Sequence, residues 1–527
     1  MRGGYFRMHI PLLLFYFLAN VSIAQELHVG SGGIVSVTAG DALYVKNNLS
    51  IDASGSLTVK SDATSSASLL VSGTSTGDIT YVRNISNTAW HLVSAPVTSQ
   101  NIPTFVADGD NGVNFNSGNG NYAVSYYKNT NDAGTRWTYH NTSPSAQNQE
   151  TLTSFINGQG YSMNRTSAGD FSFKGGLQVS DVNLTLSTSG TGHFWYCVGN
   201  PYPSFLPANN AANGSNNILA SNLSVLDSEH AALYYWDGGG GPEGGYKLIN
   251  NATGAAHFHP GQAFMVRLKS NNESFSFISS IQSHQTGTAN FYRTTNSIPS
   301  IVVSLSNGNQ NSTTKIKYIS GTTAGLDVGY DAGTYQDGVP TFSLDTHLIS
   351  DSQGTDFMLQ CLPDNDYESL VIPLAVRASA NAELVFSATS TNLPSGTDVY
   401  LHDTEENVFV KISEETYQIT LSQELQGVGR FYLHTSQSAL SVGDETLHND
   451  MRIFKTSNEN IRITGLEDLT ALSVTMYSVN GKMLMTKSYH ASSQQQDVVL
   501  PRGLAKGVYL IRVASENGTY NKKIIIE

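Results

Sequence analysis

Short stretches that alternate apolar and polar residues recur along the chain from about residue 26 to the C-terminus. Clear examples are residues 461–464 and 472–477, and runs of Gly, Asn, Asp and Ser separate such stretches. A period of two is typical of β-strands with one buried face. No long apolar stripe with the 3.6-residue period of a helix follows the first 25 residues. The pattern therefore predicts an all-β, multidomain protein.

The first 24 residues differ from the rest of the chain. Arg2 and Arg7 precede an apolar run at 10–19, and Ser22 and Ala24 place small residues just before a cleavage point. This pattern predicts a secretory signal peptide over residues 1–24. Its apolar run is too short to span a bilayer, and no later stretch is apolar enough to do so. We therefore expect no transmembrane span in the mature protein.

Residues 25–85 contain six short β-type runs punctuated by turn residues at nearly regular intervals. Such spacing predicts a short β-solenoid-like segment, in which each rung buries its apolar face on the next. A meander is the alternative arrangement.

Three landmarks then occur twice in the same order, at an offset of about 105 residues. The run that begins at Trp90 parallels the run that begins at Trp195, the Tyr pair at 126–127 parallels that at 234–235, and residues 155–161 parallel 258–264. This repetition predicts two copies of one β-rich module, at 86–190 and 191–290, packed face to face or in tandem.

The two cysteines, Cys197 and Cys361, are the only ones in the chain. Cys197 aligns with Leu92 in the repeat, and a position that accepts Leu is a core position. Because Cys is also a small buried hydrophobe, we predict two free buried thiols rather than a disulfide.

A further β-sandwich is predicted at 298–440, followed by a polar linker at 441–450. The last domain, 451–527, has about seven short strands and an Asn-Gly turn between two alternating runs, which is a strong hairpin signal. This pattern predicts a small Ig-like β-sandwich.

This last stretch resembles the type A C-terminal sorting domain of the type IX secretion system of Bacteroidetes. The resemblance lies in a strand and turn that end in Gly-Lys, a Leu-x-x-Gly-x-Tyr strand, and a basic-then-apolar terminus. The matching residues are Tyr477, Asn480, Gly481, Lys482, Leu504, Gly507, Tyr509, Lys522 and Lys523. The resemblance implies export through the periplasm by the type IX secretion machinery, to the medium or the outer-membrane surface.

The charge of the chain is unevenly distributed. Of 28 Lys and Arg, 10 lie after residue 446 and 2 in the leader; of 42 Asp and Glu, 7 lie after residue 446. The body at 25–446 therefore has 16 basic against 35 acidic residues, a net charge of −19. A body so acidic repels phosphate backbones, and we expect no nucleic-acid partner.

Candidate metal ligands lie in two acidic segments. Asp108 and Asp110 place carboxylates at alternate positions, as calcium loops do, but no bidentate Glu follows at the usual spacing. Asp327 and Asp331 belong to a segment with nine acidic and no basic residues between Lys317 and Arg377. Calcium is the ion that such loops would hold; a solvated acidic surface is the alternative.

Trp137 and Trp236 are candidate sugar-binding residues, since flat aromatic rings near Asn and Asp suit sugars; core packing is the alternative. The sequence contains no zinc-protease, phosphate-loop or dinucleotide-binding motif, which favours a non-enzymatic protein and leaves enzymatic activity open. It therefore favours a non-enzymatic, adhesin-like or matrix component of the cell surface, with glycans or surface polysaccharide as partners. A carbohydrate-binding protein and a secreted hydrolase are the alternatives.

Overall fold

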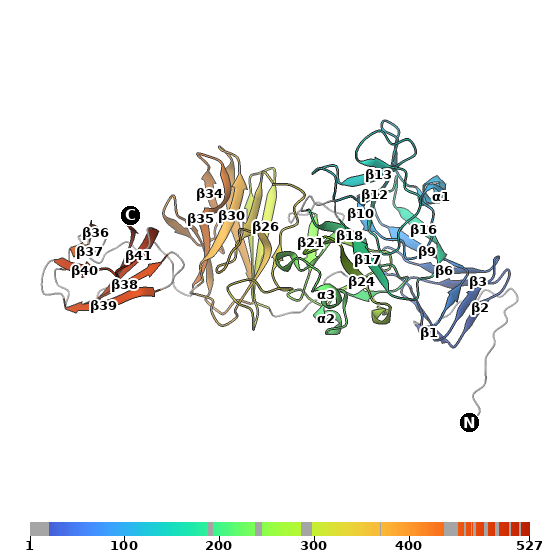
Figure 1. The fold of residues 1–527 in the computed structure, drawn as a ribbon, viewed down its shortest axis with the longest axis horizontal. Helices are drawn as coiled ribbons and strands as arrows, with labels where there is room; N and C mark the ends of the chain where they lie inside the picture. Colours follow the sequence, from blue (N-terminus) through green and yellow to red (C-terminus); the bar gives the residue numbers. More distant parts are fainter. Residues whose placement is uncertain are drawn as a thin grey trace, which may run out of the picture. The chain divides into compact units, whose positions relative to one another are not determined.

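The computed structural model describes most of the chain (Figure 1). The described residues are 21–187, 193–237, 245–285, 298–368, 370–436, 452–457, 460–464, 466, 471–478, 483–490, 495–504, 507–515 and 518–526. They form two compact units, one of residues 1–401 with 411–437 and one of 402–410 with 438–527. Strands dominate both units, so the prediction of an all-β, multidomain protein is confirmed. No helix of the described residues is long and apolar enough to cross a membrane.

The range predicted to be solenoid-like, residues 25–85, contains eight short strands, and a ninth directly precedes it. They are β1 (Val21–Ala24), β2 (Leu27–Val29), β3 (Ile34–Val37), β4 (Ala42–Val45), β5 (Leu49–Ile51), β6 (Ser56–Lys60), β7 (Ser68–Val71), β8 (Ser75–Thr76) and β9 (Asp78–Ile85). Each strand pairs in parallel with the strand three places further on, giving the ladders β1-β4-β7, β2-β5-β8 and β3-β6-β9. Leu57, Val59, Leu69 and Ile79 fill the interior between the ladders.

Strand β1 falls within the predicted leader. Cleavage after Ala24 would remove it and leave β4 paired only with β7. The signal peptide itself stays a prediction.

The two predicted module copies contain sheets with the same strand order. The first orders β10 (His91–Val93), β15 (Tyr161–Met163), β12 (Asn121–Tyr127) and β13 (Trp137–Asn141). The second orders β18 (Trp195–Gly199), β23 (Ala263–Arg267), β20 (Leu233–Trp236) and β21 (Tyr246–Ile249). The order of landmarks along the chain is thus matched by the order of strands in space. The boundary of the first copy differs from a simple division of the chain. Strand β16 (Gly169–Gly176) falls within the range predicted for that copy but pairs with β9 of the preceding segment, not with the sheet of β10, β15, β12 and β13.

The two sheets exchange equivalent hydrogen bonds at their junction. Ser94 N donates to Gly261 O over 2.9 Å, and Gly199 N donates to Gly158 O over 2.8 Å. Ser94 corresponds to Gly199 in the repeat, and Gly261 corresponds to Gly158. Both acceptor glycines have positive φ, 68° and 82°, which L side chains adopt only with strain. The copies therefore meet through a two-fold-like contact built on paired glycine turns.

Residues 298–436 form a second large β region. Its strands are β25 (Ser300–Ser306), β26 (Asn311–Tyr318), β27 (Ala332–Gly333), β28 (Ser343–Thr346), β29 (Phe357–Leu362), β30 (Ile372–Ala378), β31 (Glu383–Thr391), β32 (Asp398–Asp403), β34 (Tyr417–Thr420) and β35 (Leu425–Ser436). They follow one continuous ladder, β32-β35-β30-β28-β29-β26-β25-β31-β34, to which β27 adds at β29. Alternate residues are buried along β25 and β26, as one-sided packing requires.

The C-terminal unit contains two sheets around one core. The strands are β36 (Arg452–Ser457), β37 (Asn460–Thr464), β38 (Ala471–Ser478), β39 (Met483–His490), β40 (Gln495–Val499), β41 (Gly507–Ser515) and β42 (Gly518–Ile526). One sheet orders β36-β37-β40 and the other β39-β38-β41-β42. Ile461, Ile463, Val474 and Ile511 are fully buried between them.

Candidate functional site

The described sorting-signal residues lie on three elements of the C-terminal unit. Tyr477 lies on β38 opposite Leu510 of β41, and Tyr509 is buried on β41. Leu504 packs against the core, and Gly507 begins β41. Lys522 and Lys523 are exposed on β42, opposite Ile511 and Leu510. Asn480, Gly481 and Lys482 lie outside the described residues.

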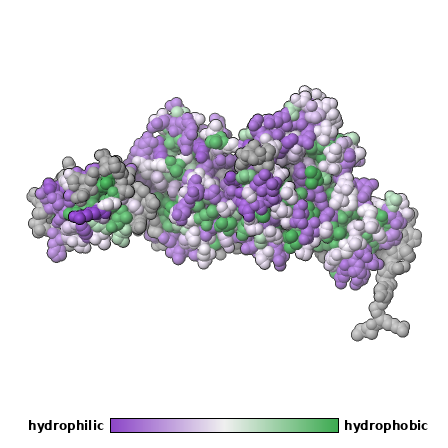
Figure 2. Space-filling model, viewed as in Figure 1, coloured by the Kyte–Doolittle hydropathy of each residue, from purple (hydrophilic) through white to green (hydrophobic). Residues whose placement is uncertain are grey.

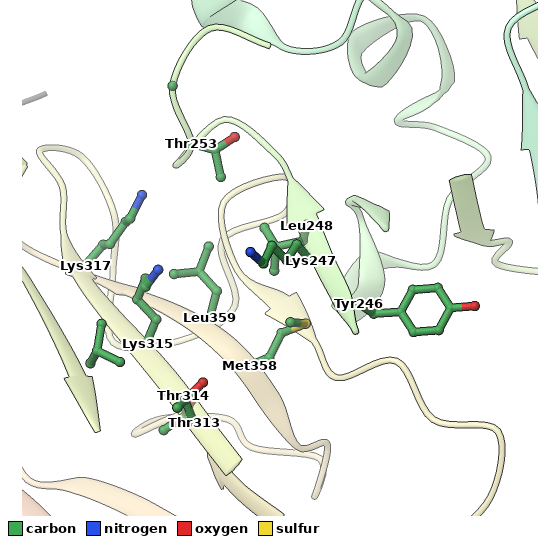
Figure 3. Close-up of a pocket in the computed structure, with 12 residues that line it drawn as sticks. Tyr246, Lys247, Leu248, Thr253, Thr313, Thr314, Lys315, Lys317, Met358 and Leu359 are labelled. Atoms are coloured by element: carbon green, nitrogen blue, oxygen red, sulfur yellow. The ribbon is translucent and has the colours of Figure 1, made fainter. Parts of the chain in front are cut away.

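A cavity of about 310 Å³ lies where β21 and the following loop face β25, β26 and β29 (Figure 3). Lys247, Lys315 and Lys317 line it together with Thr253, Thr313 and Thr314. Leu248, Val302, Met358 and Leu359 form its apolar surface. We refer to this space as the lysine cavity.

The positions of two of the lysines follow from the strand period. Lys315 and Lys317 are two residues apart on β26, so their side chains leave the same face, while Thr314, Ile316 and Tyr318 are buried on the other. Figure 3 shows the two side chains extending in one direction, with Lys247 reaching toward them from β21. Val302 on β25 lies opposite Lys315 in the register.

The three lysine ammonium groups differ in the partners that they contact. Lys247 pairs with Asp237 over 2.8 Å, and Lys317 donates to the carbonyl oxygen of Ala252. Burial lowers the pKa of Lys317, and the charge of Lys315 lowers it further. Within the part of the chain that the structure describes, the Lys315 ammonium has neither a carboxylate nor a hydrogen-bond partner. The lysine cavity therefore carries more positive than negative charge.

Three of the four candidate calcium ligands, Asp108, Asp327 and Asp331, accept hydrogen bonds from backbone N–H groups. Asp108 accepts from the N–H of Asp110 and begins a 3₁₀ turn, Gly109–Asn111. Asp331 is fully buried and accepts from the N–H groups of Asp327 and Cys361, each over 2.6 Å. Burial raises the pKa of Asp331 to about 7. Neither pair belongs to a three-ligand group within the described residues. Calcium binding stays a prediction.

A different cluster, Asp227, Glu229 and His230, brings three ligand-type atoms within 4.8 Å of one another. His230 Nδ1 lies 2.8 Å from the Asp227 carboxylate and 2.9 Å from Arg267 Nη1. Burial lowers the pKa of His230, while the bond to Asp227 opposes this effect. A guanidinium beside the histidine opposes a second cation there, so this cluster is explained as an ion-pair network.

A second buried network contains two carboxylates with different environments. Asp356 lies 2.9 Å from His347 Nε2 and 2.6 Å from Arg377 Nη1. Burial works to raise the pKa of Asp356, but its hydrogen bonds, the first from His347, lower it below its usual value. Asp345 accepts from Thr334 Oγ1 over 2.5 Å, and burial raises its pKa to about 6.

The two candidate sugar-binding tryptophans lie half-buried at the edge of one core cluster. Trp137 meets Tyr127 edge to face at 5.2 Å between ring centroids, and Trp236 meets Tyr246 in the same way at 5.0 Å. Tyr127 also hydrogen-bonds His193 and Asp337, so its ring is fixed in the interior. These contacts support the core-packing alternative, and sugar binding by the two tryptophans stays a prediction.

A family model described as a domain of unknown function (DUF8693) matches residues 17–434, well over half of the chain. The chain belongs to this DUF8693 family. A second model, described as a secretion system C-terminal sorting domain, matches residues 456–527. The sorting-domain prediction is confirmed. The protein is thus a secreted or surface protein that the type IX machinery exports, with a DUF8693 body as the cargo.

No curated protein matches the chain. Among solved structures, the glycoside hydrolase domain of Endo-D from Streptococcus pneumoniae R6 is similar at 12% identity over 29% of this chain and 33% of that one. The TM-score is 0.11, so the similarity carries no argument about fold or activity.

Sequence reasoning missed the lysine cavity of the DUF8693 body. The spacing of Lys315 and Lys317 could have indicated a positively charged site, because residues two apart on a strand lie on the same face. The contribution of Lys247 had no such signal, since it comes from β21 of the second module. The free state of Cys197 and Cys361 was predicted correctly; both are buried and unpaired.

Proposed function

We propose that this DUF8693 protein is a non-enzymatic, adhesin-like or matrix component, displayed or released after type IX export, whose body binds a ligand. The observation that carries the proposal is the lining of the lysine cavity. Its described lining residues are three lysines, three threonines, Tyr246, Gly254 and four apolar residues, with no carboxylate or histidine among them. Such a lining suits recognition of an anion more than the proton transfers of a carboxylate-based hydrolase.

The state of the buried carboxylates supports the same function. Asp331, Asp345 and Asp356 each accept hydrogen bonds from neighbouring protein groups. These bonds give the three carboxylates a role in holding the sheet together. On the visible face of the molecule, hydrophilic and hydrophobic residues are interspersed (Figure 2), which suits binding through local pockets.

The proposal is tested in cells. A deletion strain is compared with strains complemented by the full chain or by a chain that lacks residues 447–527. We expect the full chain alone to restore attachment to polysaccharide-coated surfaces. In parallel, the purified protein is incubated with polysaccharide and peptide pools. Release of reducing ends or new amines would establish the hydrolase alternative instead.

A further inference from the structure

We propose that the lysine cavity binds the carboxylate of an acidic sugar unit, a uronic acid of an extracellular polysaccharide. This inference rests on the proposed binding function and names its ligand class. It places sugar recognition at a site other than the half-buried Trp137 and Trp236.

The charge of the cavity is the first step of the argument. The Lys247 ammonium is paired with Asp237, and the Lys317 ammonium with a carbonyl oxygen, but Lys315 has no such partner among the described residues. Like charges held two residues apart on one strand repel each other. A bound carboxylate removes that repulsion and forms charge-assisted hydrogen bonds with the ammonium groups.

The contrast with the rest of the body is the second step. The body at 25–446 carries a net charge of −19, so its long-range field repels polyanions. Attraction to an anion is therefore confined to the cavity, at distances shorter than the screening length of about 8 Å in physiological salt. Such a site would select a single acidic unit by direct contact rather than collect a polyanion along a surface.

The shape and lining of the cavity are the third step. Its volume of about 310 Å³ is at the small end of the range for ligand pockets and suits one or two sugar rings. Thr313 brings a hydroxyl group that can hydrogen-bond to a sugar hydroxyl. The Thr253 hydroxyl is already engaged, because it donates to Asn250 O over 2.7 Å and accepts from Asn250 N over 3.0 Å. Leu248, Val302 and Met358 offer apolar surface to the C–H face of a ring. A simple inorganic anion would use the charge alone and leave these groups unused.

The test is calorimetric titration of the full mature chain with four probes. These are galacturonate oligosaccharides, the neutral galactose oligosaccharides of the same length, acetate, and galactose sulfate. We expect the galacturonates to bind, the neutral sugars and acetate to bind at least about tenfold more weakly, and added salt to weaken binding. Equal binding of neutral and acidic sugars, or of acetate and galacturonate, would overturn the proposal. Tighter binding of the sulfate would replace the carboxylate by a sulfate as the ligand group.

Variants connect the binding to the cavity. Lys315→Gln should weaken galacturonate binding about tenfold or more, because it removes a charge-assisted hydrogen bond. Lys315→Arg should restore most of it. Val302→Glu sets a competing carboxylate opposite Lys315 and should abolish binding. Lys174→Gln is the matched control, since Lys174 is an exposed lysine on another strand, β16. Thermal unfolding checks that all variants fold.

The outcomes separate the two proposals. If Lys315→Gln binds galacturonate as tightly as the native chain, the cavity is not the site, whatever the cells do. If the purified protein binds galacturonate through Lys315 but deletion of the gene leaves attachment unchanged, the ligand class stands and the adhesin function fails.

Discussion

At the scale of single residues, the acidic segment between Lys317 and Arg377 shows how one residue type takes several roles. Asp331 accepts two backbone N–H groups, Asp337 pairs with Arg136, and Asp356 pairs with Arg377. The sequence does not distinguish these carboxylates, because it shows how many acidic residues the segment contains but not which groups they contact. Apart from Asp327, which is four residues from Asp331, each partner comes from a distant strand or loop. The choice between calcium loop and structural ion pair therefore depends on tertiary contacts.

Asp345 should make stability depend on pH. Its folded pKa of about 6 lies above the usual value of 3.8, so the folded state holds its proton more tightly than the unfolded state. The stabilisation is fully present below pH 3.8 and is lost as the pH rises through about 6. The shift corresponds to on the order of 3 kcal/mol. Buried histidines such as His259, whose pKa burial lowers to about 3, contribute the opposite pH dependence. The contribution of Asp345 is therefore measured as the difference between the native chain and Asp345→Asn in chemical unfolding at pH 4.5 and 7.5.

Asp345→Asn should reduce this decrease, because an amide cannot ionise. Asp170→Asn, a change of an exposed aspartate on β16, is the matched control and should unfold with the native pH dependence. If Asp345→Asn and the native chain lose the same unfolding free energy between the two pH values, Asp345 does not ionise in that range.

At the scale of elements, the repeat in the sequence predicted two copies of one module, and the structure has two sheets with the same strand order. The repeat could be recognised because the Trp, Tyr and Gly landmarks occur in the same order in both copies. The contact between the copies could not be read in this way. The contact depends on hydrogen bonds from Ser94 and Gly199 to glycine turns of the other copy. The order of residues along the chain does not show which residues of the two copies meet. For residues 300–436 the sequence likewise predicted strands but not which strands pair in the sheet. Many paired strands are far apart along the chain, so the pattern of one strand does not identify its partner.

Gly261→Ala should destabilise the body by about 2 kcal/mol or more. The residue has a φ of 68°, and an added Cβ would lie 2.9 Å from the carbonyl oxygen of Ser94. Both the strain and the contact oppose the change. Gly134→Ala is the control, because its φ is 78° but nothing lies within 4 Å of the added Cβ. Denaturant unfolding measures both; equal losses would mean that the contact at Ser94 relaxes without cost.

The last strand of the sorting domain should be needed as a strand and not only for its charges. Deleting Lys522–Glu527 removes the pairing partners of residues 507–511 and exposes the edge of β41. We expect export to fall to near background in fractionated cells. The variant with Lys522→Gln and Lys523→Gln keeps the pairing, and we expect it to keep more export. Normal export of the deletion variant would contradict the assignment of β42.

At the scale of the whole molecule, the tail and most of the body belong to separate compact units. In the sequence, a polar linker and a change in charge balance precede the last domain and predict such a division; the linker at 441–450 lies outside the described residues. The lysine cavity could not be predicted, since it combines residues of the second module with strands β25, β26 and β29.

Removing residues 447–527 should leave a folded body in the periplasm. The body has its own buried cores, and the sorting domain has another. Immunoblots of periplasm, outer membrane and medium, with limited proteolysis of the retained protein, measure location and folding together. Truncated protein in normal amounts at the surface or in the medium would show that export does not need the tail.

The paired bonds between Ser94 and Gly261 and between Gly199 and Gly158 have the form of an isologous interface, in which one patch is complementary to itself. A chain with one copy would need a second chain to complete that patch. Joining both halves in one polypeptide fixes their stoichiometry and makes their association independent of protein concentration. If the protein is released into the medium, the pair of copies stays together at dilutions at which a dimer of separate chains would dissociate.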